Sequence, residues 1–131
     1  MRDDLINKLK ASEGFKGDSY LDSLNIPTIG FGTKLPLSEE EAELLLRSRL
    51  NKKINELLNE KPIIFRLPQL KQEVLFEMAY QLGTGGLLKF KKMWSALELF
   101  DYETAADEML DSRWFEQTPN RAKKLSDIIR G

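Results

Sequence analysis

The sequence of 131 residues contains no cysteine and no histidine. These absences exclude a disulfide, a thiol nucleophile, a Ser-His-Asp triad and a zinc site of the usual kind. Proton transfer near neutral pH would then depend on carboxyl, lysine or tyrosine side chains. If the protein is an enzyme that works without a cofactor, we expect a carboxylate to carry out its chemistry.

Long apolar runs and a strong net charge are also missing. The apolar runs are only a few residues long, far below the roughly 20 residues that span a bilayer. Acidic and polar residues occur among the first ten positions, where a secretory signal needs an apolar stretch, so we predict no signal peptide and no membrane insertion. The 20 basic and 21 acidic residues give a net charge of −1, which provides no strong field for nucleic acid.

The apolar periodicity predicts an α+β fold that is mainly helical and contains one small antiparallel sheet. Residues 15–33 carry Gly, Asp, Ser, Asn and Pro between isolated apolar residues, which is typical of short strands and turns. Ser38 and Glu41 fit a capping box, which predicts the start of a long helix. The expected helices cover residues 3–12, 38–59, 70–82, 87–100, 102–110 and 119–130.

Local signals mark the ends of the later helices. Gly83 is expected to end one helix, and the pair Gly85-Gly86 is expected to force a turn. Asp101 supplies an N-cap for the helix over 102–110. Thr118 supplies an N-cap for the last helix, which has a proline at its first position.

The length is that of one domain, and we expect this domain to have two lobes. Residues 13–37 would form a small lobe containing the sheet, residues 38–59 a connecting helix, and residues 60–131 a helical lobe. A cleft between the lobes is where a binding site would be expected.

Two carboxyl groups in unlike settings point to glycoside hydrolysis. Glu13 follows the apolar first helix, which suits the acid that protonates a leaving oxygen, while Asp22 lies on a polar strand or turn, which suits an ionised base. Thr28 offers a hydroxyl that can hold the attacking water. The alternative is that a glutamate at a helix end and an aspartate in a turn are ordinary surface residues.

Three segments resemble the phage-type lysozymes, the endolysins of glycoside hydrolase family 24. The spacing of Glu13, Asp22 and Thr28, followed by Ile-Gly-Phe-Gly, is similar to the catalytic signature of that family. Residues 112–123 (SRWFEQTPNRAK) are similar to a run in the T-even phage lysozymes, and residues 78–83 (MAYQLG) resemble a buried helical segment of the same fold. The resemblance implies a lysozyme-like domain with two lobes.

This resemblance implies a muramidase, which cuts the β-1,4 bond between N-acetylmuramic acid and N-acetylglucosamine with inversion. Glu13 would be the general acid, Asp22 the base and Thr28 the residue that positions water. Gly30 would support the site, and Arg121 would lie beside Glu13. No metal and no cofactor are implied.

Further residues are candidates for contact with sugar rings, by their flat faces or hydrogen-bonding groups. For the two aromatic residues, an equally good interpretation is that they fill the core and satisfy their polar tips. The candidate substrate-binding residues are Lys34, Tyr80, Gln81, Arg113 and Trp114.

The chain departs from the family pattern in its N-terminal lobe. Thr33 stands where many relatives have histidine, and Ser12 stands where T-even members have an acid. The segment between Thr33 and Ser38 is short, so the N-terminal lobe is expected to be smaller and to cover fewer sugar subsites.

We expect a monomer that acts on peptidoglycan glycan strands and binds no nucleic acid. Without a signal it would accumulate in the cytoplasm of a bacterial host and need a holin to reach the wall. One alternative is a peptidoglycan-binding or phage tail module of the same fold without catalysis. Another is a helical nucleic-acid-binding protein that uses the basic residues at 89–92 and 121–124.

Overall fold

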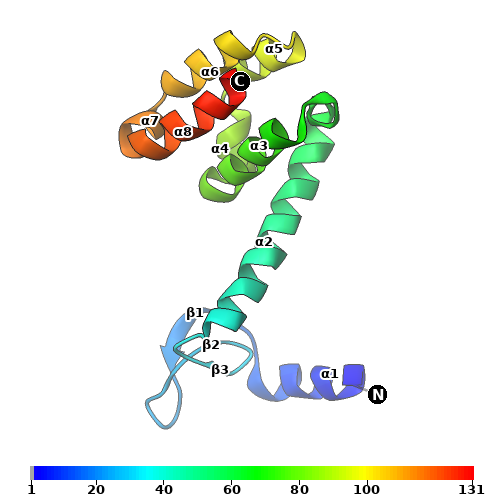
Figure 1. Ribbon diagram of the computed structural model, residues 1–131. Coiled ribbons are helices and arrows are strands. Elements are labelled where there is room, and N and C mark those ends of the chain that lie inside the picture. The colour runs from blue at the N-terminus through cyan, green and yellow to red at the C-terminus, as the bar shows by residue number, and fades with distance from the viewer. Residues whose placement is uncertain (1) are drawn as a thin grey trace. The chain divides into compact units, whose positions relative to one another are not determined.

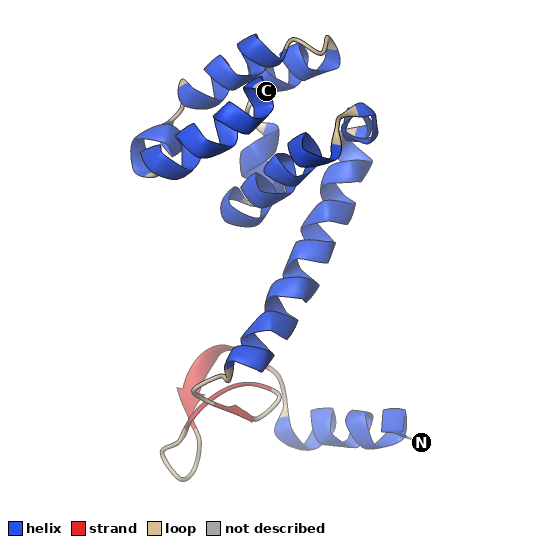
Figure 2. Cartoon of the chain, in the orientation of Figure 1, coloured by secondary structure: helices blue, strands red, loops and turns tan. Residues whose placement is uncertain are grey.

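The computed structural model describes residues 2–131, and within them the chain forms eight α-helices, one 3-10 helix and a three-stranded sheet (Figures 1 and 2). The fold is therefore α+β and mainly helical, as expected. Two compact units divide the chain, Met1–Leu45 and Leu46–Gly131. The elements are α1 (Arg2–Glu13), β1 (Lys16–Leu21), β2 (Pro27–Gly30), β3 (Thr33–Lys34), α2 (Glu39–Glu60), η1 (Pro62–Arg66), α3 (Gln69–Leu82), α4 (Thr84–Leu88), α5 (Lys91–Glu98), α6 (Tyr102–Leu110), α7 (Arg113–Gln117) and α8 (Pro119–Arg130).

The first unit contains α1 and the antiparallel sheet, whose strand order is β1-β2-β3. On the central strand, Thr28 pairs with Tyr20 of β1 and with Lys34 of β3. The pairing of β1 with β2 shifts register between Lys16 and Tyr20, which is a bulge. Among the described residues of this unit, Thr28 is buried but no apolar side chain is. This sheet is therefore held together by backbone hydrogen bonds and polar contacts rather than by an apolar core of its own.

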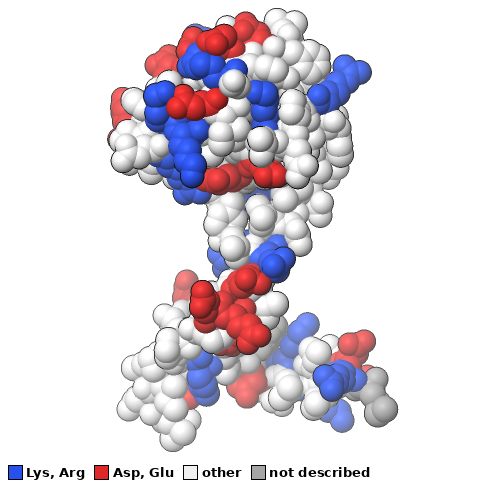
Figure 3. Space-filling view, viewed as in Figure 1, with Lys and Arg blue, Asp and Glu red and all other residues white. Residues whose placement is uncertain are grey.

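The long helix α2 begins where the capping box predicts. The Ser38 amide donates to Glu41 Oε1 at 2.9 Å, and the Glu41 amide donates to Ser38 Oγ at 3.1 Å. These reciprocal bonds satisfy two amides that a helix start leaves without partners. Acidic side chains gather over this first turn of α2 (Figure 3), where the positive end of the helix dipole stabilises them.

The second unit contains the apolar core. Its buried side chains come from the end of α2 and from every later helix, and Met78, Met93 and Met109 are fully buried among them. Lys71 is also buried, and its ammonium donates to the carbonyls of Ile128 and Ile129 at 3.1 and 2.6 Å. Lys71 therefore ties α3 to the C-terminal end of α8, where carbonyl groups lack helical partners.

Three expectations about the helical region are wrong. Residues 85–86 do not form a turn, because they lie inside α4, and the helix expected over 87–100 is divided into α4 and α5. Residues 113–117 form a separate helix, α7, which Ser112 caps by accepting from the Phe115 amide at 3.1 Å. Thr118 does precede α8, but its hydroxyl donates to the Trp114 carbonyl and caps no amide of α8.

The other expected helices and caps are confirmed. The helix α3 ends before Gly83, and Asp101 caps α6 by accepting from the Thr104 amide at 3.2 Å. Within residues 2–131, every helix is too short or too polar to cross a bilayer.

Candidate active site

Asp22 lies in the turn that joins β1 to β2, and its side chain builds that turn. Its Oδ1 accepts from the amides of Leu24 at 2.8 Å and Ile26 at 2.9 Å. The Asp22 amide in turn donates to the Ile26 carbonyl at 3.0 Å. Aspartate favours such turns because its short side chain reaches backbone amides two to four residues ahead. The carboxylate is thereby held in one orientation.

Lys34 of β3 binds the other oxygen of the same carboxylate. The distance from Lys34 Nζ to Asp22 Oδ2 is 2.7 Å, and the Asp22 side chain is only 14% exposed. The hydrogen bond from Lys34, followed by that from the Ile26 amide, lowers the pKa of Asp22 below its ordinary value. Asp22 is therefore ionised near neutral pH, which is the state that a general base needs.

Glu13 is the last residue of α1, and its carboxyl group lies against the turn between β2 and β3. A Cβ atom added to Gly32 would lie 2.5 Å from Glu13 Oε2 and 2.7 Å from its Cδ. Gly32 also has a φ of +76°, a left-handed conformation that favours glycine. The backbone conformation therefore favours glycine here, and a larger residue would displace the Glu13 carboxyl group. Glu13 is otherwise exposed to solvent.

The structure thus brings Glu13, Asp22 and Lys34 to the same part of the first unit. Hydrogen bonding to Asp22 raises the pKa of Lys34, and attraction to Asp22, Glu13 and Tyr20 adds to this effect. The Lys34 ammonium is consequently charged at neutral pH and lies within the influence of both candidate catalytic carboxyl groups.

Thr28 and Gly30 lie on the central strand of this sheet. Thr28 is fully buried, and its hydroxyl donates to the Ile26 carbonyl at 2.8 Å. The hydroxyl oxygen keeps its acceptor positions, and its role in holding water stays a prediction. Gly30 ends β2 and pairs with Lys16 of β1.

The remaining candidates belong to the second unit. Trp114 is 3% exposed, and its indole donates to Gln81 Oε1 at 3.0 Å. The Trp114 ring also meets Phe90 edge-on at 6.3 Å. These contacts agree with the core interpretation of Trp114, and they engage the amide oxygen of Gln81. Tyr80, by contrast, is 37% exposed.

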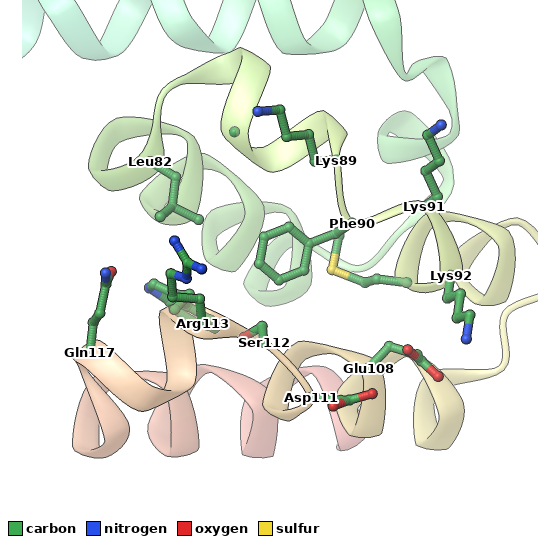
Figure 4. Close-up of a pocket in the computed structure, with 13 residues that line it drawn as sticks. Leu82, Lys89, Phe90, Lys91, Lys92, Glu108, Asp111, Ser112, Arg113 and Gln117 are labelled. Atoms are coloured by element: carbon green, nitrogen blue, oxygen red, sulfur yellow. The ribbon is translucent and has the colours of Figure 1, made fainter.

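Two cavities in this unit contain candidate residues. One of about 600 Å³ has Arg113 and Trp114 in its wall, and Figure 4 shows the Phe90 ring between Arg113 and lysines 91 and 92, with Glu108 and Asp111 on the α6 side. The other, of about 500 Å³, is lined by Tyr80 and Arg121 together with apolar residues of α2 and α3.

Arg121 has an acidic partner inside the second unit. Its Nε donates to Glu77 Oε2 at 2.8 Å. Glu13 belongs to the first unit, and the expected proximity of Arg121 to Glu13 stays a prediction.

A family model described as phage lysozyme matches residues 10–129, a range that includes every candidate residue above. The chain belongs to the phage lysozyme family. It is 26% identical over 153 residues to the probable T4-type lysozyme 1 of Dictyostelium discoideum, covering 92% of this chain and 90% of that protein. The probable T4-type lysozyme 2 of the same organism is 28% identical over 96 residues, covering 71% of this chain and 56% of that protein.

A phage protein also resembles part of this phage lysozyme chain. The pre-baseplate central spike protein of Enterobacteria phage T4 is 37% identical over 68 residues, which is 52% of this chain and 12% of the spike protein. The chain thus spans a small part of that relative, and membership of the phage lysozyme family supports the glycoside hydrolase class in general. No group of three acidic, histidine or cysteine side chains that could hold a metal occurs in residues 2–131.

Sequence reasoning missed two features of this candidate site. Lys34 was expected as a substrate-binding residue, and its hydrogen bond to Asp22 was not expected. Gly32 was noted only as part of a motif, and its contact with Glu13 was not expected. A prediction that Thr28 pairs with Lys34 across the hairpin would have indicated that Lys34 belongs to the sheet.

Proposed function

We propose that this chain is a muramidase that hydrolyses the β-1,4 bond between N-acetylmuramic acid and N-acetylglucosamine in peptidoglycan. One observation supports the proposal most directly: Lys34 binds the fixed and ionised carboxylate of Asp22 at 2.7 Å and is also attracted by the exposed carboxyl group of Glu13. Glycoside hydrolysis needs two carboxyl groups with different protonation states. Membership of the phage lysozyme family supports the same reaction class.

In the proposed reaction, Glu13 donates a proton to the glycosidic oxygen as the bond to the anomeric carbon breaks. Asp22 accepts a proton from the water that attacks that carbon, and Thr28 helps to position the water. Attack on the face opposite the leaving group inverts the anomeric configuration. Neither step calls for a metal or a cofactor.

Binding of the glycan strand is assigned to residues outside this catalytic group. The exposure of Tyr80 supports contact with a sugar face, and Arg113 and Trp114 line a cavity. Gln81 offers a polar contact, while Gly30 and Arg121 have supporting roles.

The biological setting belongs to the same proposal. The protein would be a monomer that accumulates in the cytoplasm of a bacterial host, reaches the wall through holin action and lyses the cell. Its near-neutral charge balance provides no strong field for nucleic acid.

The test is the release of reducing ends from purified peptidoglycan. Glu13→Gln and Asp22→Asn each remove one ionisable group and keep the side-chain shape, and we expect either to lower the rate by at least about 100-fold. Glu98→Gln, an equivalent change at an exposed position of α5, is the matched control and should cleave like the wild type. Wild-type rates in both site variants would refute the assignment.

A second candidate is a phage structural module that binds peptidoglycan without cutting it. The identity of 37% to the T4 spike protein favours this possibility over part of the chain. Sedimentation with insoluble peptidoglycan separates the two: binding without release of reducing ends would support the structural module.

A further inference from the structure

The carboxylate of Asp22 has three hydrogen-bond donors around it. Its Oδ1 accepts from two backbone amides at 2.8 and 2.9 Å, and its Oδ2 accepts from the Lys34 ammonium at 2.7 Å. An ionised carboxylate has about four acceptor positions, two on each oxygen. One position therefore remains available, and it lies on Oδ2, beside Lys34.

The backbone of Lys34 is fixed by the sheet. Lys34 pairs with Thr28 on the central strand, and the next amide, that of Leu35, donates to the Pro27 carbonyl at 2.8 Å. Asp22 lies on the other side of β2, just after β1 ends. The ion pair therefore bridges the two strands that flank β2, and it connects residues 12 positions apart.

The charged and titratable groups near this pair come from three elements. Lys34 of β3 faces Asp22 directly, Glu13 of α1 attracts the ammonium, and Tyr20 of β1 adds a weaker attraction. The Lys34 side chain is 53% exposed, so its head stays in contact with water while it binds Asp22. The Asp22 side chain is 14% exposed, so it is partly accessible to solvent.

We infer that Lys34 is the positioning residue of Asp22: together with the amides of Leu24 and Ile26 it leaves a single lone pair of Oδ2 to take the proton of the attacking water. This inference rests on the proposed function and assigns to Lys34 a role other than contact with sugar. As the water oxygen bonds to the anomeric carbon, its proton passes to that lone pair. The leaving oxygen takes the proton of Glu13, so the step is balanced.

The experiment compares Lys34→Met, which keeps the length of the side chain and removes its charge, with Lys34→Arg, which keeps the charge. Lys8→Met, an equivalent change at an exposed position of α1, is the matched control. For each protein, the titration of the Asp22 carboxyl carbon is followed by NMR, and kcat and KM are measured on peptidoglycan fragments as a function of pH.

In Lys34→Met we expect the pKa of Asp22 to rise, the acidic limb of the kcat profile to move to higher pH, and kcat at the optimum to fall roughly tenfold with little change in KM. Lys34→Arg should recover most of both effects, and Lys8→Met should show neither.

The inference is overturned if Asp22 titrates alike in wild type and Lys34→Met, or if Lys34→Met alters only KM, which would make Lys34 a sugar contact. The NMR titration needs no turnover. If the wild type cleaves nothing, the proposed function fails while the coupling of Lys34 to Asp22 is still measured.

Discussion

The contact between Gly32 and Glu13 predicts that one added methyl group at position 32 lowers the activity far more than it lowers the stability. In Gly32→Ala, the new Cβ would lie 2.5 Å from Glu13 Oε2, whereas ordinary contacts of this kind begin near 3.4 Å. The Glu13 carboxyl must therefore move by roughly 1 Å, and a misplacement of this size at a reacting group costs about 100-fold in rate. The φ of +76° adds about 1–2 kcal/mol of backbone strain for alanine.

The loss of stability should stay near that strain, because the exposed end of Glu13 can move away at little cost. Gly83→Ala is the matched control, since Gly83 has a φ of +79° but no atom within 4 Å of the added Cβ. Urea denaturation measures the free energy of unfolding, and release of reducing ends measures the rate. We expect both variants to be destabilised and only Gly32→Ala to lose about 100-fold in activity. Equal activities in the two variants would refute this account of the contact.

Two further predictions concern pH and stability. Burial lowers the pKa of Lys71, so the unfolded chain binds more protons than the folded chain over the pH range between the two pKa values. The free energy of unfolding of the wild type, compared with that of Lys71→Met, should therefore rise as pH increases from the lowered folded pKa toward about 10.4. At neutral pH, Lys71→Met leaves the last carbonyls of α8 without this donor and should cost about 1–3 kcal/mol, measured by urea denaturation. The lowered pKa of Asp22 acts in the same direction over a lower pH range: its stabilisation is complete above the unfolded pKa near 3.9 and is lost as pH falls through the folded value. Urea denaturation at several acidic pH values should show a larger loss in the free energy of unfolding in the wild type than in Asp22→Asn.

The catalytic candidates are held by a unit in which no described apolar side chain is buried. Polar contacts, such as the Asp22 turn and the ion pair with Lys34, therefore fix the geometry of the carboxyl groups. A segment held mainly by exposed hydrogen bonds opens at lower free energy than a packed core. We expect amide hydrogen exchange to be faster in the sheet than in α3.

Helix ends with local chemical signals could be read from the sequence. The capping box at Ser38 and Glu41, the stop at Gly83 and the cap at Asp101 all involve residues within four positions of one another. Such signals act through the backbone of the same segment. They predicted the limits of α2, α3 and α6 to within a residue.

The division between α4 and α5 was decided by packing. The apolar pattern continues across residues 89–90, so periodicity alone predicts one helix. In the fold, the Leu87 carbonyl accepts from the Phe90 amide at 3.1 Å and from the Trp94 indole at 3.0 Å, so the ring of α5 is tied to the end of α4. A bond of this kind depends on where the ring packs in the core.

The candidate site shows the same distinction. The types and spacing of Glu13, Asp22 and Thr28 indicated the chemistry through their resemblance to the catalytic signature of the phage-type lysozymes. Strand pairing decided that Lys34 binds Asp22, and the approach of α1 to the β2–β3 turn decided that Gly32 contacts Glu13. Local hydrogen bonds follow from neighbouring residues, whereas an ion pair across 12 positions and the close approach of Glu13 to Gly32 exist only once the chain has folded.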